Sequence, residues 1–169
     1  MDIDVDPDWW KTLFDEIYLI TDARSIDDDE ITRQEVDIFS SMIPFQPNDR
    51  ILDLCGGHGR HALELCRRGD YDCTVLDYSQ SLLDVGKRNA RERQSSIRFI
   101  QGDARHTSLP AETFDHVLIL GNSLGYIMEP GADLKILAES RRLLKPCGWL
   151  LLDVSDGDAA RTSLAPRAW

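Results

Sequence analysis

Short apolar runs separated by stretches with helical periodicity dominate the chain from about residue 48 onward. The runs are rich in Val, Ile and Leu, which is typical of strands buried in a parallel sheet. The stretches between them are long enough for the crossover that two parallel strands require. This alternation predicts an α/β fold with a doubly wound, mainly parallel sheet and helices on both faces. Strands are predicted at Ile51–Cys55, Cys73–Leu76, Ile97–Ile100, His116–Gly121 and Trp149–Val154, and helices at His61–Arg68, Ser81–Arg93 and Asp133–Leu144.

Two further helices are predicted ahead of the first strand. From Asp8 to about Leu19, aromatic and aliphatic residues recur every three or four positions, which predicts an amphipathic helix whose aromatic stripe needs a surface to cover. A second helix is predicted from about Asp28 to Met42, where the following prolines end it. We therefore divide the chain into an N-terminal helical segment, residues 1–47, that covers the predicted site, and a ligand-binding domain, residues 48–169.

The acidic charge of the protein is concentrated in the N-terminal segment. The chain holds 19 Lys and Arg against 30 Asp and Glu, so its formal net charge is −11. Residues 1–37 contain 13 of the acids and 3 of the bases, and the other 17 acids and 16 bases leave the remainder close to neutral. A nucleic-acid partner is disfavoured because binding a phosphate backbone normally needs a clustered basic face.

The sequence shows no signal for a membrane, for export or for a metal. No apolar run reaches the roughly 18 residues of a membrane helix, and acids stand where a secretory signal needs bases, so we expect a cytoplasmic protein without a membrane partner. The four cysteines and four histidines form no C-x-x-C or H-E-x-x-H pattern, which predicts reduced thiols and no metal site.

Glycines and carboxylates follow the predicted strands, at the edge of the sheet where open α/β folds bind their ligands. The first strand leads into Asp53-Leu-Cys-Gly-Gly-His-Gly-Arg-His-Ala62, whose glycines let the backbone turn sharply and approach a ligand. Asp77 follows the second strand, where a carboxylate can accept hydrogen bonds from ribose hydroxyls. Asp103 follows the third strand and Asn122 the fourth. The pattern predicts a nucleoside-binding site.

Two nucleoside cofactors suit such a loop. Gly57-x-Gly59-x-x-Ala62 matches the dinucleotide fingerprint, with Asp77 near the expected distance. Asp53 at the mouth of the loop would repel a pyrophosphate, whereas it would attract the amino group and sulfonium of S-adenosyl-L-methionine. Simpler structural roles also exist, because Asp53 could cap the turn, Asp77 could support Ser79 at the next helix, and Asp103 could be a turn residue.

Taken in order, these segments resemble the class I S-adenosylmethionine-dependent methyltransferases, which have a Rossmann-like fold. The resemblance covers about residues 48–155. It is carried by five segments: Ile51-Leu-Asp-Leu-Cys-Gly-Gly-His-Gly-Arg60, Val75-Leu-Asp-Tyr-Ser79, Gly102-Asp-Ala104, Phe114-Asp-His-Val-Leu-Ile-Leu-Gly-Asn-Ser-Leu-Gly125 and Leu144-Lys-Pro-Cys-Gly-Trp-Leu150. One departure is Cys55, which stands where the family usually has its first glycine.

The resemblance implies a role for each matching position. Asp53 would hold the cofactor's amino group, Asp77 the ribose hydroxyls, and Asp103 the adenine amine beside the backbone of Ala104. Leu120 to Asn122 would line the end where the methyl group is transferred. The cofactor-binding residues implied in this way are Asp53, Cys55, Gly56, Gly57, Gly59, Asp77, Tyr78, Asp103, Ala104, Leu120 and Asn122.

The acceptor and the catalytic residues are less defined. The Leu-Gly-Asn-Ser segment is similar to that of the glycine and sarcosine N-methyltransferases, which favours a small-molecule acceptor such as an amine. Methyl transfer is a direct displacement that depends mainly on alignment, so no catalytic residue is assigned. Asn122, Tyr126 and the aromatic helix bearing Trp9, Phe14 and Tyr18 are candidates for closing the site and excluding water.

The resembled family normally continues with another helix and two more strands, and the sequence stops before them. We therefore expect a fragment or a short form whose fifth strand is an exposed edge capable of self-association. The favoured function is an S-adenosylmethionine-dependent methyltransferase. The alternatives are a non-catalytic S-adenosylmethionine-binding or scaffold domain and, less favoured, an NAD-dependent oxidoreductase.

Overall fold

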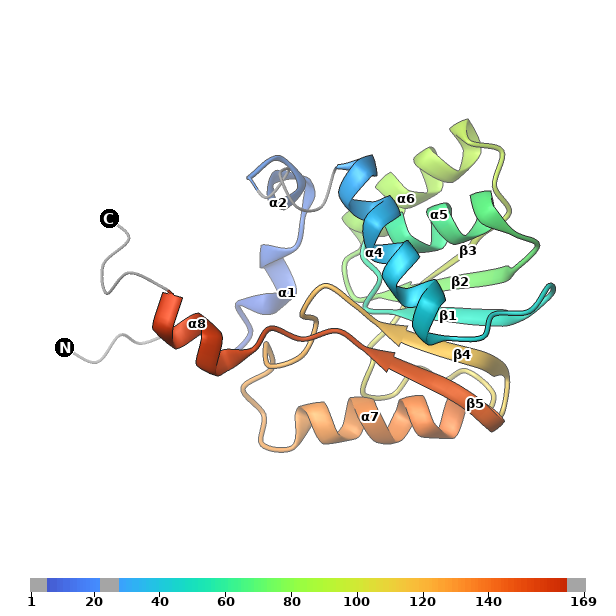
Figure 1. Cartoon of the computed structure of the whole chain (residues 1–169). Coiled ribbons are helices and arrows are strands. Elements are labelled where there is room, and N and C mark those ends of the chain that lie inside the picture. The colour runs from blue at the N-terminus through green and yellow to red at the C-terminus, as the bar shows by residue number, and fades with distance from the viewer. Residues whose placement is uncertain (1–5, 22–27, 164–169) are drawn as a thin grey trace.

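The computed structural model describes residues 6–21 and 28–163. Its centre is a five-stranded, entirely parallel sheet in the order β3-β2-β1-β4-β5 (Figure 1). The strands are β1 (Arg50–Leu54), β2 (Asp72–Asp77), β3 (Arg98–Gln101), β4 (Phe114–Ile119) and β5 (Leu144–Leu152). The order reverses between β1 and β4, the position at which doubly wound sheets form a crevice for ligands. The predicted α/β fold is confirmed.

Helices cover both faces of this sheet, as the two periodicities of the sequence require. In Figure 1, α4 (Asp29–Met42), α5 (Arg60–Arg68) and α6 (Gln80–Glu92) lie over one face, and α7 (Ala132–Leu143) lies under the other. Successive strand residues alternate between the faces. Ile51 packs with Val36 and Leu83 in one core cluster, whereas Leu52 packs with Ile136 in the other. Both clusters are apolar and deeply buried.

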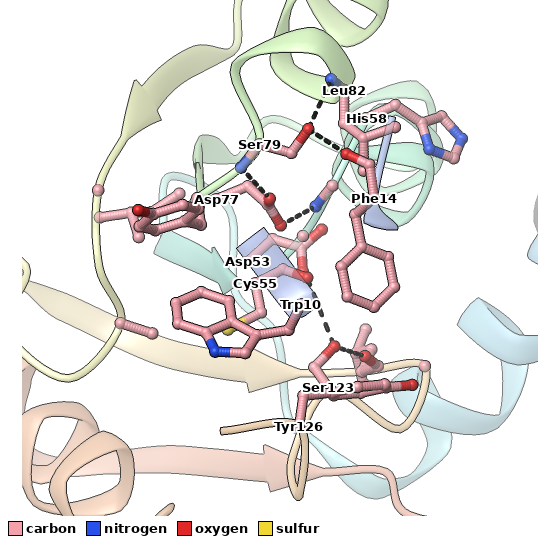
Figure 2. Close-up of a pocket in the computed structure, with 18 of the residues that line it drawn as sticks. Trp10, Phe14, Asp53, Cys55, His58, Asp77, Ser79, Leu82, Ser123 and Tyr126 are labelled. Atoms are coloured by element: carbon pink, nitrogen blue, oxygen red, sulfur yellow. Dashed lines mark hydrogen bonds between the residues drawn. The ribbon is translucent and has the colours of Figure 1, made fainter. Parts of the chain in front are cut away.

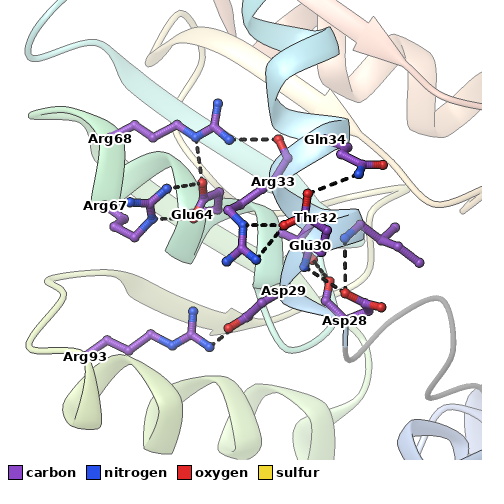
Figure 3. A network of polar contacts seen from close by, with 11 residues as sticks. Asp28, Asp29, Glu30, Thr32, Arg33, Gln34, Glu64, Arg67, Arg68 and Arg93 are labelled. Carbon is purple, nitrogen blue, oxygen red and sulfur yellow. Dashed lines mark hydrogen bonds and ion pairs between the residues drawn. The ribbon is translucent and has the colours of Figure 1, made fainter.

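A hydrogen bond and an ion pair connect α4 to its neighbouring helices (Figure 3). Glu64 on α5 accepts hydrogen bonds of 2.7 Å from both Arg67 and Arg68. Arg68 also donates to the Arg33 carbonyl on α4 at 2.8 Å, and Arg93 after α6 contacts Asp29 at 3.2 Å. Polar contacts as well as apolar packing therefore hold α4 against α5 and α6.

The amphipathic stretch predicted as one helix from Asp8 to Leu19 is interrupted. It forms α1 (Trp10–Leu13) and α2 (Glu16–Thr21). The side chain of Asp15 accepts hydrogen bonds from the backbone N–H groups of Ile17 and Tyr18, so it caps a new helix instead of continuing the old one. The helix predicted from Asp28 is confirmed, with Asp28 as its N-cap.

The C-terminal part of the sheet differs from the prediction in its boundaries. β5 begins at Leu144, five residues before the predicted Trp149, because Leu144 already pairs with Phe114 and a register shift follows. Pro146 and Gly148 suggest a turn, but an edge strand tolerates both. A short helix, α8 (Gly157–Ser163), follows without having been predicted. Within the described residues, no helix is long and apolar enough to cross a membrane.

Candidate functional site

A cavity lies at the carboxyl ends of β1, β2 and β4, beside the two N-terminal helices (Figure 2). Parallel strands bring their following loops to one edge of the sheet, so residues from distant parts of the sequence meet here. Of the predicted site residues, the cavity is lined by Asp53, Cys55, Gly56, Gly57, Asp77, Tyr78, Asp103, Ala104 and Leu120. Gly59 and Asn122 are not among the lining residues.

The glycine loop after β1 wraps tightly around the first of the carboxylates. A Cβ at Gly56 would lie 2.5 Å from the carboxyl carbon of Asp53, so only glycine allows this approach. Gly59 has φ +74° and precedes α5, and a Cβ there would lie 3.0 Å from both Val75 and Phe99. Gly59 therefore serves the close packing of the loop on β2 and β3, which explains its absence from the cavity. Cys55 adopts φ +61°, a conformation that side chains rarely take.

Asp77 holds this loop against the start of α6. One carboxylate oxygen accepts a hydrogen bond from the backbone N–H of Gly57 and the other from that of Ser79, both at 2.8 Å. Burial raises the pKa of Asp77, and these backbone hydrogen bonds offset only part of the effect. Asp77 therefore does support Ser79 at the start of α6. Because Asp77 also lines the cavity and each carboxylate oxygen has a second lone pair, the same side chain can still accept from a ligand.

Asp53 has a different environment, because its charge is buried with only partial compensation. The residue is 1% exposed, and neither carboxylate oxygen has a hydrogen-bond partner of normal geometry among the described residues. Burial raises its pKa, and the charges of His61 and Arg60, with the nearby backbone N–H of Ala62, lower it only in part. A buried acceptor without donors is costly to a folded protein. In a cavity wall, such a group marks the place where a cationic or hydrogen-bonding ligand group fits.

The two nearest cationic side chains are turned to another acid. Arg60 and His61 line the cavity, but both bind Glu35 on α4, His61 through Nε2 at 3.0 Å. Burial alone would raise the pKa of Glu35, but the hydrogen bonds from His61 and Arg60 prevail and lower it to about 2. This arrangement leaves Asp53 unpaired although positive charge is close.

Asp103 is bound by an arginine that sequence reasoning missed. Nε and Nη2 of Arg105 grip the two carboxylate oxygens of Asp103 at 3.0 and 2.6 Å, and Nη1 reaches Glu129 at 2.5 Å. The hydrogen bond from Arg105 lowers the pKa of Asp103. The guanidinium also lies 5.8 Å from the ring centroid of Trp10. Asp103 is thus a fixed anion at the cavity wall.

At the end of β4, the structure corrects the expectation for Asn122. Its side chain is exposed and accepts a hydrogen bond from the backbone N–H of Ser155 at 3.0 Å, so it joins two loops and does not line the cavity. Ser123 takes its place in the lining, with its hydroxyl donating to the carbonyl of Leu120 at 2.6 Å. Leu120 lines the cavity as predicted.

Aromatic side chains of the N-terminal helices form the opposite wall. Trp10, Phe14 and Tyr18 line the cavity together with Tyr126 from the loop after β4. The ring of Phe14 lies 5.2 Å from Tyr126 and 5.1 Å from Tyr18, nearly perpendicular to both. Trp9 contacts Tyr126 at 5.7 Å without lining the cavity itself. The hydroxyl of Ser79 donates to the carbonyl of Phe14, which ties the junction of α1 and α2 to the start of α6.

Among the lining residues that were not predicted as site residues are Trp10, His61 and Ser123. Trp10 carried a signal in the aromatic stripe, but the helical spacing could not show which face of that stripe meets the sheet. His61 follows the glycine loop directly and could have been suspected from that position. Ser123, next to Asn122, gave no separate signal. Among the described residues, no group of three His, Cys, Asp or Glu side chains could hold a metal ion.

Comparison with known proteins agrees with this geometry. A family model described as a methyltransferase domain matches residues 51–148, which is more than half of the chain and includes the carboxyl ends of β1 to β4. The chain belongs to the class I S-adenosylmethionine-dependent methyltransferase family.

Curated relatives of this chain are named for different acceptors. It is 33% identical over 131 residues to a glycine/sarcosine N-methyltransferase of Parasynechococcus marenigrum, covering 77% of the chain and 46% of that protein. It is 32% identical over 154 residues to a demethylmenaquinone methyltransferase of Renibacterium salmoninarum, covering 89% of the chain and 60% of that protein. The chain thus spans about half the length of the curated relatives it matches.

Solved structures share the fold of this chain. The PH0226 protein of Pyrococcus horikoshii matches with a TM-score of 0.73 and 25% identity, over 88% of this chain and 66% of that one. A phosphoethanolamine N-methyltransferase of Haemonchus contortus, in complex with phosphoethanolamine and S-adenosylhomocysteine, matches with a TM-score of 0.72 over 93% of this chain and 34% of that one. At 20% identity, the second likeness shows the fold alone.

The residues of the cavity fit the family's cofactor, S-adenosyl-L-methionine. That molecule carries an ammonium group and a sulfonium but no phosphate, and the cavity offers the unpaired carboxylate of Asp53. The carboxylates of Asp77 and Asp103 add two hydrogen-bond acceptors at the neighbouring strand ends. A pyrophosphate would face three acids on this wall, so the dinucleotide alternative fits poorly.

Proposed function

We propose that this protein binds S-adenosyl-L-methionine and transfers its methyl group to a small-molecule acceptor, in particular an amine. The observation that carries the proposal is the unpaired carboxylate of Asp53, held 1% exposed against the glycine loop in the cavity wall. Because a buried acid with so little compensation destabilises a fold, its presence at the family's cofactor position supports a role in binding a cation.

We assign the cofactor contacts by strand end. Asp53 binds the amino group of the methionine part, and Gly56 and Gly57 let the backbone approach it. Asp77 accepts from the ribose hydroxyls. At the far end, Asp103, fixed by Arg105, accepts from the adenine amine. The remaining assigned neighbours of the cofactor are Cys55, Tyr78, Ala104 and Leu120.

The acceptor would enter between the end of β4 and the N-terminal helices. Phe14, Tyr18 and Tyr126 offer perpendicular aromatic walls there, which exclude water and favour the positive charge that develops on a methylated nitrogen. The bound cofactor supplies an electrophilic methyl group. The chain's own contribution is alignment, so an amine that arrives unprotonated needs no protein base. In this proposal, α1 and α2 of the N-terminal helical segment cover the site, and residues 48–169 form the cofactor-binding domain.

Calorimetric titration with S-adenosylmethionine, S-adenosylhomocysteine and NAD tests the cofactor assignment. We expect both sulfur compounds to bind and NAD not to bind. Binding of NAD alone would overturn the proposal in favour of an oxidoreductase. Methyl transfer to glycine and sarcosine, measured as formation of S-adenosylhomocysteine, then tests the acceptor class. Cofactor binding without turnover on any small amine would favour a non-catalytic binding or scaffold domain.

We also propose that β5 mediates self-association. It is an edge strand, and Trp149, Leu150 and Leu152 are 48%, 37% and 38% exposed. Such an edge can pair with another strand. Light scattering coupled to size exclusion should show dimers that Leu150→Lys abolishes, and a monomer at high concentration would refute this. The cytoplasmic location and the lack of a nucleic-acid partner stay predictions from composition.

A further inference from the structure

Trp10 carries a buried hydrogen-bond donor that no group in the described structure satisfies. The residue is 8% exposed, lines the cavity, and its indole Nε1–H has no partner among the described residues. The polar end of a buried tryptophan usually finds a partner, and leaving it without one costs stability. A phenylalanine would fill much of the same space without that cost, so the nitrogen needs a separate explanation.

The neighbours of Trp10 place it at one end of the cavity. Its ring lies 4.8 Å from the ring of Tyr78, which follows β2, and 5.8 Å from the guanidinium of Arg105. Arg105 is bound to Asp103, after β3. The methionine end of the cofactor, at Asp53 and the glycine loop, belongs to β1. Trp10 therefore stands between the positions assigned to the ribose and to the adenine.

At that place the ligand has acceptors to offer. The adenine ring carries three unsubstituted nitrogens with in-plane lone pairs, whereas its amine is a donor that suits Asp103. An indole N–H can only donate, so it complements a ring nitrogen and not the amine. Trp10 and Asp103 would thus form hydrogen bonds with different atoms of the adenine.

We propose that Trp10 is a cofactor-binding residue whose indole Nε1–H donates a hydrogen bond to a ring nitrogen of the adenine of S-adenosylmethionine. This inference rests on the proposed function. It extends the site to the N-terminal helical segment: α1 takes part in recognising the base as well as in covering it. The same hydrogen bond discriminates in favour of adenine over bases that present a donor at that position.

The Trp10→Phe variant tests this by two measurements with opposite expected outcomes. Affinity for S-adenosylhomocysteine, measured by calorimetry, should fall roughly tenfold because one buried hydrogen bond is lost. The thermal midpoint of the unliganded protein should stay equal or rise, because the variant removes an unsatisfied donor. A merely structural role for Trp10 would lower the midpoint and leave the intrinsic affinity unchanged. Trp149→Phe, on β5 and outside the cavity, is the matched control for binding and should leave the affinity for S-adenosylhomocysteine unchanged.

Analogues of S-adenosylhomocysteine identify the accepting atom. In the 1-deaza, 3-deaza and 7-deaza compounds, one ring nitrogen at a time is replaced by CH. One analogue should bind the wild type roughly tenfold more weakly than the parent compound and bind Trp10→Phe as well as the parent does. Equal losses in both proteins, or no loss with any analogue, would overturn the inference. If the wild type fails to bind S-adenosylhomocysteine at all, the proposed function fails with it; binding that ignores Trp10 refutes this inference alone.

Discussion

Two groups of carboxylates in this protein have opposite environments. On the helical layers, Glu64 and Glu139 are 5% and 7% exposed, and each is held by arginine. Around the cavity, Asp53 has no partner of normal geometry and Asp77 has backbone partners only (Figures 2 and 3). The pKa values follow, because arginine hydrogen bonds lower those of Glu64 and Glu139 to about 2, whereas burial raises those of Asp53 and Asp77.

The paired carboxylates stabilise the folded state, whereas those around the cavity destabilise it. A carboxylate whose pKa is lowered by folding contributes stability when ionised, and one whose pKa is raised opposes folding when ionised. The cavity therefore costs stability that the paired helices offset. Sites built for ligands commonly show this imbalance, because the ligand supplies the missing partner.

The largest expected effect is a loss of stability in acid, caused by protonation of the arginine-paired carboxylates Glu64 and Glu139. Glu64 and Glu139 have pKa values of about 2 in the folded protein against 4.5 for the ordinary side chain. Their contribution is fully present above pH 4.5 and is lost as the pH falls toward 2. Allowing for the exposure of the arginine partners, each carboxylate contributes about 2 kcal/mol. Urea unfolding between pH 7 and pH 2.5 should show this decline.

Substitution assigns the decline to these residues. Glu64→Gln and Glu139→Gln should each lower the free energy of unfolding at pH 7 and flatten its fall toward pH 2.5, with cofactor affinity unchanged. Glu30→Gln is the matched control, since Glu30 also pairs with an arginine but is 62% exposed, and it should leave the curve close to that of the wild type. An equally steep acid limb in both buried variants would contradict the argument.

Substitution of Asp53, the carboxylate without a partner, should weaken ligand binding. Asp53→Asn keeps the shape of the side chain and removes its charge. Affinity for S-adenosylhomocysteine should fall by about 2 kcal/mol, roughly 30-fold, because the ligand's ammonium loses an anionic acceptor. The free energy of unfolding at pH 7 should not fall and should rise relative to the wild type, since the folded state no longer holds a buried charge. The gain should shrink below pH 3.8, where the wild-type acid is protonated in both states.

Asp115, near the amino end of β4, is the matched control for Asp53. Its carboxylate accepts from Lys145 at 2.9 and 2.8 Å and from the backbone N–H of Arg50 at 2.9 Å. Although burial acts against it, these hydrogen bonds lower the pKa of Asp115. Asp115→Asn should therefore lower stability without changing cofactor affinity. If the two Asn variants behaved alike, the distinction between the two groups of carboxylates would be wrong.

The sequence predicted the fold and most strand-end residues because both depend on local periodicity and on a topology that collects strand ends at one edge. It failed where packing between distant segments decides. Asn122 turns away to join Ser155, and Asp103 is gripped by Arg105, which also reaches Glu129. The interruption of the first helix depends on one side chain, Asp15, that a periodic pattern treats as an ordinary polar position.

The same reasoning explains why Trp10 escaped prediction. An aromatic stripe shows that a helix covers something, but it does not show which ring reaches the cavity. The sequence also could not show that Arg60 and His61 turn to Glu35, which is what leaves Asp53 unpaired. The defining feature of the site is the lack of a partner, and no motif reports that.

The smallest expected effect concerns Cys55, the departure from the family's glycine pattern. Its φ of +61° costs a residue with a Cβ about 1 kcal/mol, while its thiol lines the cavity. Burial raises the pKa of that thiol, so it stays protonated and is not a nucleophile.

Cys55→Gly relieves the strain but loses the buried sulfur and gains freedom in the unfolded chain, so these changes should nearly cancel. Cys55→Ala keeps the strain and loses the sulfur, so it should be less stable than Cys55→Gly by up to about 1 kcal/mol. Thermal unfolding of the three proteins would show this order, and an alanine variant more stable than the glycine variant would mean that the backbone at this position is not strained.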